Sequence, residues 1–208
     1  MWIKVCGMTT DEAIHAALEA HVDAIGFVFA AESKRYVTPE RARDLAIPAR
    51  GKAKRIAVTR HPTQHDIDDI LAIFRPDILQ TDAEDFATLK LPASLERLPV
   101  VRASTSEPRA LPARLLFEGP VSGTGIPADW NAARQLALRA ELILAGGLTP
   151  NNVADAIRVV CPFGVDVSSG VEQSPGIKSP EKIVTFVRSA RAASRELPRA
   201  ERAKENAS

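Results

Sequence analysis

Eight short apolar segments recur along the chain, and longer amphipathic segments separate most of them. The apolar segments are rich in Val, Ile, Leu or Phe and lack the apolar–polar alternation of a strand with one solvent-exposed face. This pattern predicts parallel strands that are buried on both faces. The predicted strands are residues 3–6, 24–29, 55–58, 77–80, 100–102, 115–118, 142–145 and 164–167.

The segments between the predicted strands carry the apolar spacing of helices. Ile67, Ile70, Leu71 and Phe74 lie at positions i, i+3, i+4 and i+7, which places them on one face of a helix. We also expect three helices to begin at a hydroxyl residue followed by proline, because the hydroxyl accepts a first-turn amide and proline fits the first helical position. These pairs are Thr38-Pro39, Thr149-Pro150 and Ser179-Pro180.

Eight successive βα units predict one α/β domain, a (β/α)8 TIM barrel over residues 1–191. An open doubly wound sheet is the alternative that periodicity alone leaves open. Only residues 103–114 separate the fifth and sixth predicted strands, and they contain Pro108 and Pro112, so we expect an irregular fifth αβ unit. Residues 192–208 are rich in Ala, Arg, Glu and Lys without an apolar stripe, which predicts a charged C-terminal tail, frayed or disordered.

Composition argues against several kinds of partner. The net charge is +1, which gives no electrostatic reason to expect nucleic acid or an anionic membrane. No segment reaches the ~18 apolar residues of a membrane span, and the start of the chain lacks a secretory signal pattern. The two cysteines, Cys6 and Cys161, are far apart, which predicts a cytoplasmic protein and no disulfide scaffold. No Cys or His spacing predicts a metal site.

Enzymes with this fold carry their chemistry on the loops that follow the carboxyl ends of the strands. Cys6 lies at the end of the first predicted strand, where it is either a packing residue or a functional thiol. Arg35 follows the second strand and is either a solvated loop charge or a ligand for a planar carboxylate. Glu118 ends the sixth strand and is a candidate acid or base.

Glycine-rich loops follow the seventh and eighth predicted strands. The first contains Gly146 and Gly147, and the second contains Ser168, Ser169 and Gly170. Glycine lets the backbone approach a ligand closely, and amides at a helix start favour an anion. Two such loops in this order predict a phosphate site, at the position where TIM barrels commonly have one.

Taken together, these segments resemble the phosphoribosylanthranilate isomerase family, over roughly residues 2–191. Lys4-Val5-Cys6-Gly7-Met8-Thr9 resembles the family's N-terminal signature KICG[IL]T. Residues 26–29 with 33–37 resemble its second-strand motif, and residues 144–148 and 164–172 resemble its last two strand–loop motifs. The family's barrel also has an irregular fifth αβ element.

The resemblance implies an Amadori rearrangement of N-(5′-phosphoribosyl)anthranilate in tryptophan biosynthesis, with no metal or organic cofactor. It implies that Cys6 is the general base and Glu118 the general acid, and that Arg35 binds the anthranilate carboxylate. It also places Asp82 and Asp166 among the substrate-binding residues. The phosphate of this small-molecule substrate is expected on Gly146, Gly147, Ser168, Ser169 and Gly170. The protein is expected to be a monomer or a homodimer.

Three segments depart from the family pattern. Ala57-Val58-Thr59-Arg60 stands where a GVF-like strand is common, and the other two changes lie close to the presumed site. The family's acid is an aspartate where this chain has Glu118, and the family's fourth-strand histidine aligns with Asp82. These changes leave open a barrel with an altered substrate, or a non-catalytic barrel that binds a phosphosugar. Another phosphosugar enzyme, such as a pentulose-phosphate epimerase, would ordinarily show metal-ligating His/Asp pairs or a different first-strand signature.

Overall fold

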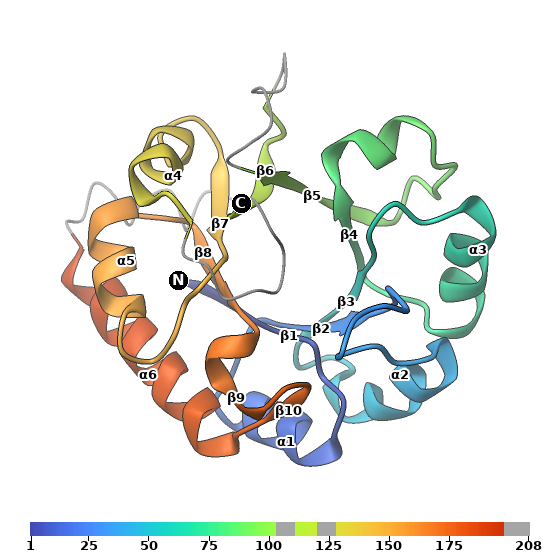
Figure 1. Cartoon of the computed structure of the whole chain (residues 1–208), viewed down its shortest axis with the longest axis horizontal. Helices are drawn as coiled ribbons and strands as arrows, with labels where there is room; N and C mark the ends of the chain where they lie inside the picture. Colours follow the sequence, from blue (N-terminus) through green and yellow to red (C-terminus); the bar gives the residue numbers. More distant parts are fainter. Residues whose placement is uncertain (103–110, 120–127, 198–208) are drawn as a thin grey trace.

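The computed structural model describes residues 1–102, 111–119 and 128–197. Its core is a closed barrel of eight parallel strands, in which each strand pairs with the next and β8 pairs back with β1 (Figure 1). The predicted TIM barrel is therefore confirmed, and the open sheet is wrong. The strands are β1 (Trp2–Cys6), β2 (Ala24–Val28), β3 (Lys54–Val58), β4 (Ile78–Asp82), β5 (Glu96–Arg102), β6 (Arg114–Glu118), β7 (Glu141–Leu144) and β8 (Gly164–Val167).

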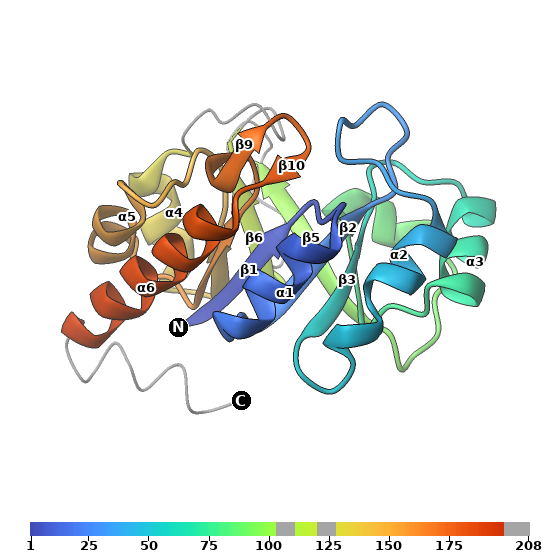
Figure 2. The same ribbon diagram turned by 90° about the horizontal axis from the view of Figure 1, so that it is seen from below.

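Helices surround the barrel (Figures 1 and 2). The connection from β4 to β5 contains a short 3-10 helix, η2 (Ala83–Ala87). The sequence pattern did not predict a 3-10 helix at this position. Of the predicted irregular fifth unit, residues 103–110 lie outside the described residues. The α-helices are α1 (Asp11–Glu19), α2 (Pro39–Leu45), α3 (Gln64–Ile73), α4 (Trp130–Ala137), α5 (Val153–Val160) and α6 (Pro180–Glu196).

Two of the three predicted helix starts are confirmed. The hydroxyls of Thr38 and Ser179 accept first-turn amides of α2 and α6. The prediction for Thr149-Pro150 is wrong, because α5 begins at Val153 with Asn152 at its N-cap. The Asn152 side-chain carbonyl accepts from the Thr149 amide at 2.7 Å, which closes a separate turn ahead of the helix.

The inside of the barrel is filled by side chains that point inward from alternate strand positions. Most are apolar, and this inner cluster consists of Ala24, Ile56, Ile78, Leu98, Val100, Leu116, Ile143 and Ala145. Lys4 is a fully buried exception on β1. A buried charge needs a partner, and Lys4 has one in Asp166 on the neighbouring β8.

A small hairpin follows β8 and η3 (Ser169–Val171), and the sequence did not predict it. Its strands are β9 (Glu172–Ser174) and β10 (Ile177–Lys178), which pair antiparallel (Figure 2). Gly176 at the turn has a φ of 87°, and its carbonyl accepts a hydrogen bond from the Thr9 hydroxyl at 2.7 Å. The hairpin is thereby held over the loop that follows β1.

Helix α6 continues to Glu196, five residues past the boundary that we expected between the barrel and the tail. Ala193 and Ser194 are buried, and Glu196 forms an ion pair with Arg158 of α5 at 2.8 Å. Ala193 and Ser194 thus continue the spacing of the buried face of α6, and the ion pair with α5 lies at the last residue of the helix. The remaining tail residues 198–208 lie outside the described part of the chain.

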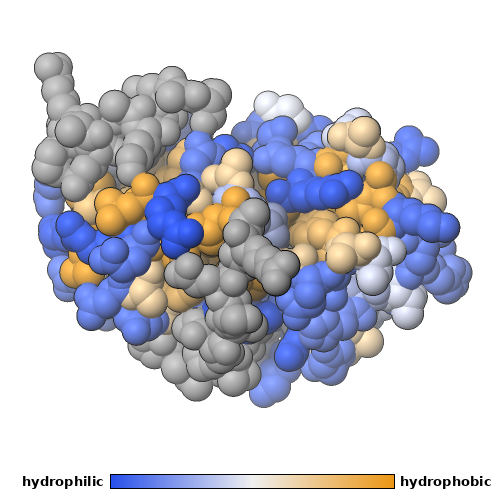
Figure 3. Space-filling view, turned by 90° about the horizontal axis from the view of Figure 1, so that it is seen from above, coloured by the Kyte–Doolittle hydropathy of each residue, from blue (hydrophilic) through white to orange (hydrophobic). Residues whose placement is uncertain are grey.

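Hydrophilic and hydrophobic residues are interspersed on the face drawn in Figure 3. Within residues 1–102, 111–119 and 128–197, no helix is long and apolar enough to cross a lipid bilayer.

Candidate active site

The candidate residues from distant parts of the sequence meet at the carboxyl end of the barrel. Cys6 ends β1, Asp82 ends β4, Glu118 ends β6 and Asp166 lies near the end of β8. In a closed barrel of parallel strands these ends share one rim, and the loops after β7 and β8 border the same rim.

Cys6 is buried beside Lys4, which precedes it by two residues and therefore leaves β1 on the same face. The Lys4 ammonium donates to Asp166 Oδ1 at 3.0 Å. Gly26 of β2 makes room for both side chains. A Cβ at position 26 would lie 3.0 Å from Cys6 Sγ and 3.1 Å from Lys4 Cε.

Glu172 binds two cations at this rim. It accepts two hydrogen bonds from Arg35, at 2.6 and 3.0 Å, and one from the Lys178 ammonium at 2.9 Å. Lys178 also donates to the carbonyl and hydroxyl oxygens of Ser168, and the Ser168 hydroxyl donates to the Cys6 carbonyl at 3.1 Å. Arg35 is therefore a fixed cation of the site. We call Lys4, Cys6, Arg35, Asp166, Glu172 and Lys178 the thiol cluster.

Burial and charge act in opposite directions on the thiol cluster. Burial raises the pKa of Cys6, the positive charge of Lys4 lowers it, and Asp166 raises it again, with a net increase. Burial lowers the pKa of Lys178, although Glu172 opposes this effect. Burial would also lower the pKa of Lys4, but the Asp166 carboxylate and Cys6 outweigh it, so that pKa is raised. Lys4 is thus held as an ammonium ion next to the thiol.

A second group of charges links β4, β5 and β6. Arg102 of β5 donates to Asp82 Oδ1, and its Nη2 lies 3.0 Å from Glu118 Oε1. The Asp82 side chain is only 2% exposed, so Arg102 neutralises a carboxylate that water barely reaches. We call His61, Asp82, Asp85, Arg102 and Glu118 the carboxylate cluster.

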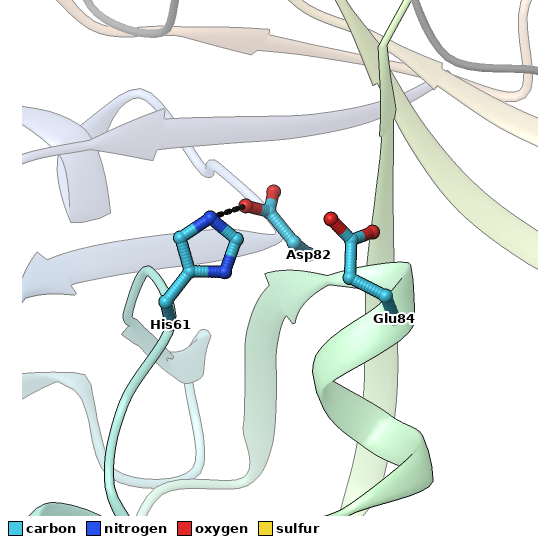
Figure 4. A group of neighbouring side chains, drawn as sticks. All are labelled: His61, Asp82 and Glu84. Carbon is cyan, nitrogen blue, oxygen red and sulfur yellow. Dashed lines mark ion pairs between the residues drawn. The ribbon is translucent and has the colours of Figure 1, made fainter.

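His61 joins this cluster from the loop after β3. Its Nδ1 lies 3.0 Å from Asp85 Oδ1. Its Nε2 lies 3.3 Å from Asp82 Oδ2, the ion pair drawn in Figure 4. Asp85 in turn accepts a hydrogen bond from the Thr81 hydroxyl at 2.5 Å. The hydrogen bond to Asp85 raises the pKa of His61, and Asp82 adds to the effect.

His61, Asp82 and Glu84 also offer three ligand atoms within 4.8 Å of one another, a grouping that sequence spacing did not suggest. Among the described residues, Asp82 Oδ2 is buried and accepts no hydrogen bond, and its contact with His61 Nε2 is an ion pair only. Two features work against a metal ion here. Arg102 already compensates Asp82, and a raised pKa favours the imidazolium form of His61, which cannot bind a metal. The geometry is that of an ion-pair network.

The two predicted phosphate loops are in direct contact. Gly146 and Gly147 both have positive φ angles, 89° and 64°, which favour glycine. A Cβ on Gly170 would lie 1.9 Å from the Leu148 carbonyl oxygen, so only glycine lets the β8 loop approach the β7 loop this closely. The glycine-rich segment 122–125 after Glu118 lies outside the described residues.

Sequence analysis missed several charged residues of the site. Arg102 lies at the carboxyl end of a predicted strand, and this position could have identified it as a site residue. Glu172 lies within one of the motifs that carried the family resemblance. His61 and Lys178 gave no signal, because they reach the rim from a loop and from the unpredicted hairpin.

The family model described as N-(5′-phosphoribosyl)anthranilate (PRA) isomerase matches residues 3–189 of the chain. A protein named N-(5′-phosphoribosyl)anthranilate isomerase from Rhizobium rhizogenes is 38% identical, in an alignment that covers 88% of this chain and 91% of that protein.

Solved structures give the same result. TrpF from Jonesia denitrificans is 36% identical and superposes with a TM-score of 0.79, covering 93% of this chain and 98% of its own. A phosphoribosyl anthranilate isomerase in complex with reduced 1-(o-carboxyphenylamino)-1-deoxyribulose 5-phosphate is 29% identical, with a TM-score of 0.77. That comparison covers 92% of this chain and 99% of the solved one.

Proposed function

Because the chain belongs to the N-(5′-phosphoribosyl)anthranilate isomerase family, we propose that it converts N-(5′-phosphoribosyl)anthranilate to 1-(2-carboxyphenylamino)-1-deoxyribulose 5-phosphate. The family assignment makes the protein an isomerase of tryptophan biosynthesis. One observation carries the proposal for the reaction: Cys6, Glu118, Arg35 and the two glycine-rich loops all border one rim of the barrel. We expect a cytoplasmic monomer or homodimer.

The proposed reaction needs an acid and a base at different atoms of the sugar. Glu118 protonates the furanose ring oxygen, and the ring opens to a Schiff base. The Cys6 thiolate then removes the C2 proton, and the resulting enol tautomerises to the ketone. The steps conserve all atoms of the substrate, so the reaction is an isomerisation and consumes no co-reactant.

The proposed acid is bound to a cation in the free protein, since Arg102 lies 3.0 Å from Glu118. Such a pair favours an ionised carboxylate, whereas a general acid must carry a proton. We therefore propose that the Arg102–Glu118 pair separates when substrate binds. Asp82, which also binds Arg102, is then the residue that retains the guanidinium.

The remaining candidates would hold the substrate between acid and base. We propose that Gly146, Gly147 and the segment 168–170 bind the phosphate, and that Arg35 binds the anthranilate carboxylate. Glu172 supports this role, because its bidentate contact fixes the Arg35 guanidinium at the rim. Asp82 and Asp166 lie at the same rim and are proposed to contact the sugar.

The direct test is a fluorescence assay. Phosphoribosylanthranilate is generated in situ from anthranilate and phosphoribosyl pyrophosphate, the purified protein is added, and loss of substrate fluorescence is followed. Chromatography identifies the product. We expect turnover well above spontaneous decay of the substrate, and formation of the deoxyribulose phosphate.

The assay also separates the alternatives. Binding of reduced 1-(o-carboxyphenylamino)-1-deoxyribulose 5-phosphate without any turnover would contradict the proposal and indicate a phosphosugar-binding barrel. If the protein neither binds this compound nor turns over phosphoribosylanthranilate, an altered substrate would be indicated.

A further inference from the structure

Lys4 occupies a position at which a barrel interior ordinarily has an apolar side chain. It is completely buried on β1, and its ammonium is bound to Asp166 on β8. A buried ion pair is poor evidence for stability, because removing two charges from water offsets much of their attraction. The pair therefore calls for a chemical explanation at this site.

The Lys4 side chain passes next to the Cys6 sulfur. Both side chains leave the inner face of β1 and pack on Gly26 of β2, where a single added Cβ would touch Cys6 Sγ at 3.0 Å and Lys4 Cε at 3.1 Å. The carbon that carries the Lys4 ammonium is thus beside the thiol. The same ammonium contacts Asp166 Oδ1 at 3.0 Å, so it lies between a carboxylate and the sulfur.

The charges around the thiol leave one cation in excess. Lys4, Arg35 and Lys178 are positive, whereas Asp166 and Glu172 are negative. A thiolate at Cys6 would bring the thiol cluster to neutrality. Arg35 and Lys178 both bind Glu172 directly, while Lys4 is the cation that shares the face of β1 with Cys6.

We infer that Lys4 is a positioning residue for the proposed base, and that its ammonium group stabilises the Cys6 thiolate. The inference rests on the proposed function only in giving that thiolate a catalytic role. Asp166 has the opposite effect on the thiolate, because it adds a negative charge beside Lys4. Lys178 also lowers the pKa of Cys6, but by less than Lys4 does.

The test measures the ionisation of Cys6 without substrate. All proteins in this test carry Cys161→Asn. Asparagine is chosen because it tolerates the left-handed conformation of residue 161, whose φ is 50°. The single remaining cysteine is labelled with 13C, and its Cβ chemical shift is followed across pH. The Asp166→Asn and Lys4→Met/Asp166→Asn variants are compared. In the first, the Cys6 thiolate becomes the anionic partner of the Lys4 ammonium, and in the second both charges of the buried pair are removed.

We expect Asp166→Asn to move the thiol titration to lower pH, and the added Lys4→Met change to move it back by about one pH unit or more. That shift corresponds to a roughly ten-fold smaller thiolate fraction below the midpoint. Lys54→Met, on an exposed lysine, should leave the titration unchanged. In variants that retain activity, the alkaline midpoint of the pH profile of kcat/KM should shift in the same directions as the thiol titration.

Equal titration midpoints for the single and double variants would overturn the inference. If the double variant does not fold, Lys4→Gln/Asp166→Asn in the same background replaces it, and a midpoint equal to that of Asp166→Asn has the same meaning. The outcomes remain separate from those of the assay. A shifted titration in a protein without isomerase activity would support the Lys4 inference and contradict the proposed function.

Discussion

Arg102 at the end of β5 lies 3.0 Å from the carboxylate of Glu118 at the end of β6. The same guanidinium binds Asp82 at the end of β4, and Asp82 contacts His61. Three successive strands therefore contribute to one chain of ion pairs along the rim. This chain connects the proposed acid to a buried carboxylate, so changes at Asp82 or Arg102 should affect both stability and catalysis.

We expect Glu118→Gln to lower kcat roughly 10²–10⁴-fold, the range for loss of a general acid, with a much smaller change in KM. The amide keeps the shape of the side chain but cannot donate an acidic proton. Steady-state fluorescence kinetics measure the effect, with Glu19→Gln on the exposed side of α1 as the matched control. A near-normal kcat would assign the acid to another group.

We expect Cys6→Ser to abolish measurable turnover, while Cys161→Ser remains active. The thiolate is the proposed base, and burial raises the pKa of Cys6. The free enzyme must carry a thiolate at Cys6 and a proton on Glu118, so kcat/KM should fall as the pH rises through the raised pKa of Cys6, because above it Glu118 keeps losing its proton while the thiolate no longer increases. A pH–rate profile checks this direction, and activity that keeps rising through the pKa of Cys6 would contradict the pairing of a Cys6 base with a Glu118 acid.

We expect Arg102→Ala to lower the free energy of unfolding by about 3–5 kcal/mol, because it leaves the buried Asp82 carboxylate without its guanidinium. Urea denaturation measures the loss. Arg102→Met combined with Asp82→Asn should recover much of it, since no buried charge is then unpaired. Arg43→Ala serves as the control, because the Arg43–Asp44 pair is exposed and should contribute at most about 1 kcal/mol. An equal loss in both alanine variants would show that burial of Asp82 is unimportant.

We expect Gly170→Ala to raise KM and to destabilise the fold by roughly 1–3 kcal/mol, because the new methyl group would overlap the Leu148 carbonyl oxygen. The β7 and β8 loops must then separate, and the proposed phosphate site with them. Gly51→Ala is the control, because Gly51 has a φ of 72° but open space around it. It should lose some stability through backbone strain and keep a normal KM.

The pH dependence of stability should depend on Glu172. Burial would raise the pKa of Glu172, but Arg35 and Lys178 outweigh it and hold that pKa below its ordinary value of 4.5. A carboxyl group with a lowered pKa stabilises the fold above its unfolded pKa, and this contribution is lost as the pH falls through the folded pKa. Glu172→Gln should thus be less stable at pH 7, with the difference from wild type shrinking below about pH 4.5. Urea midpoints between pH 3 and 7 measure it; a constant difference would contradict the assignment.

The sequence by itself determined the order of the barrel. Its apolar segments identified all eight strands of the barrel, because parallel strands buried on both faces need continuous apolar runs. Strand β5 shows where that rule weakens. It begins at Glu96, before Pro99, and proline is ordinarily a signal against a central strand. The strand ends also located Cys6 and Glu118, since a parallel barrel brings its carboxyl ends to one rim.

Only the tertiary structure decided which charges meet. Lys4 and Asp166 are 162 positions apart and become neighbours because β8 closes on β1. Glu172 and Lys178 lie on a hairpin that no periodic pattern predicts, and this hairpin brings them to Arg35 and the thiol cluster. Local patterns record how each segment hydrogen-bonds and which face it buries. Coulomb interactions and hydrogen bonds between side chains depend instead on distances of a few ångströms, and barrel closure sets those distances.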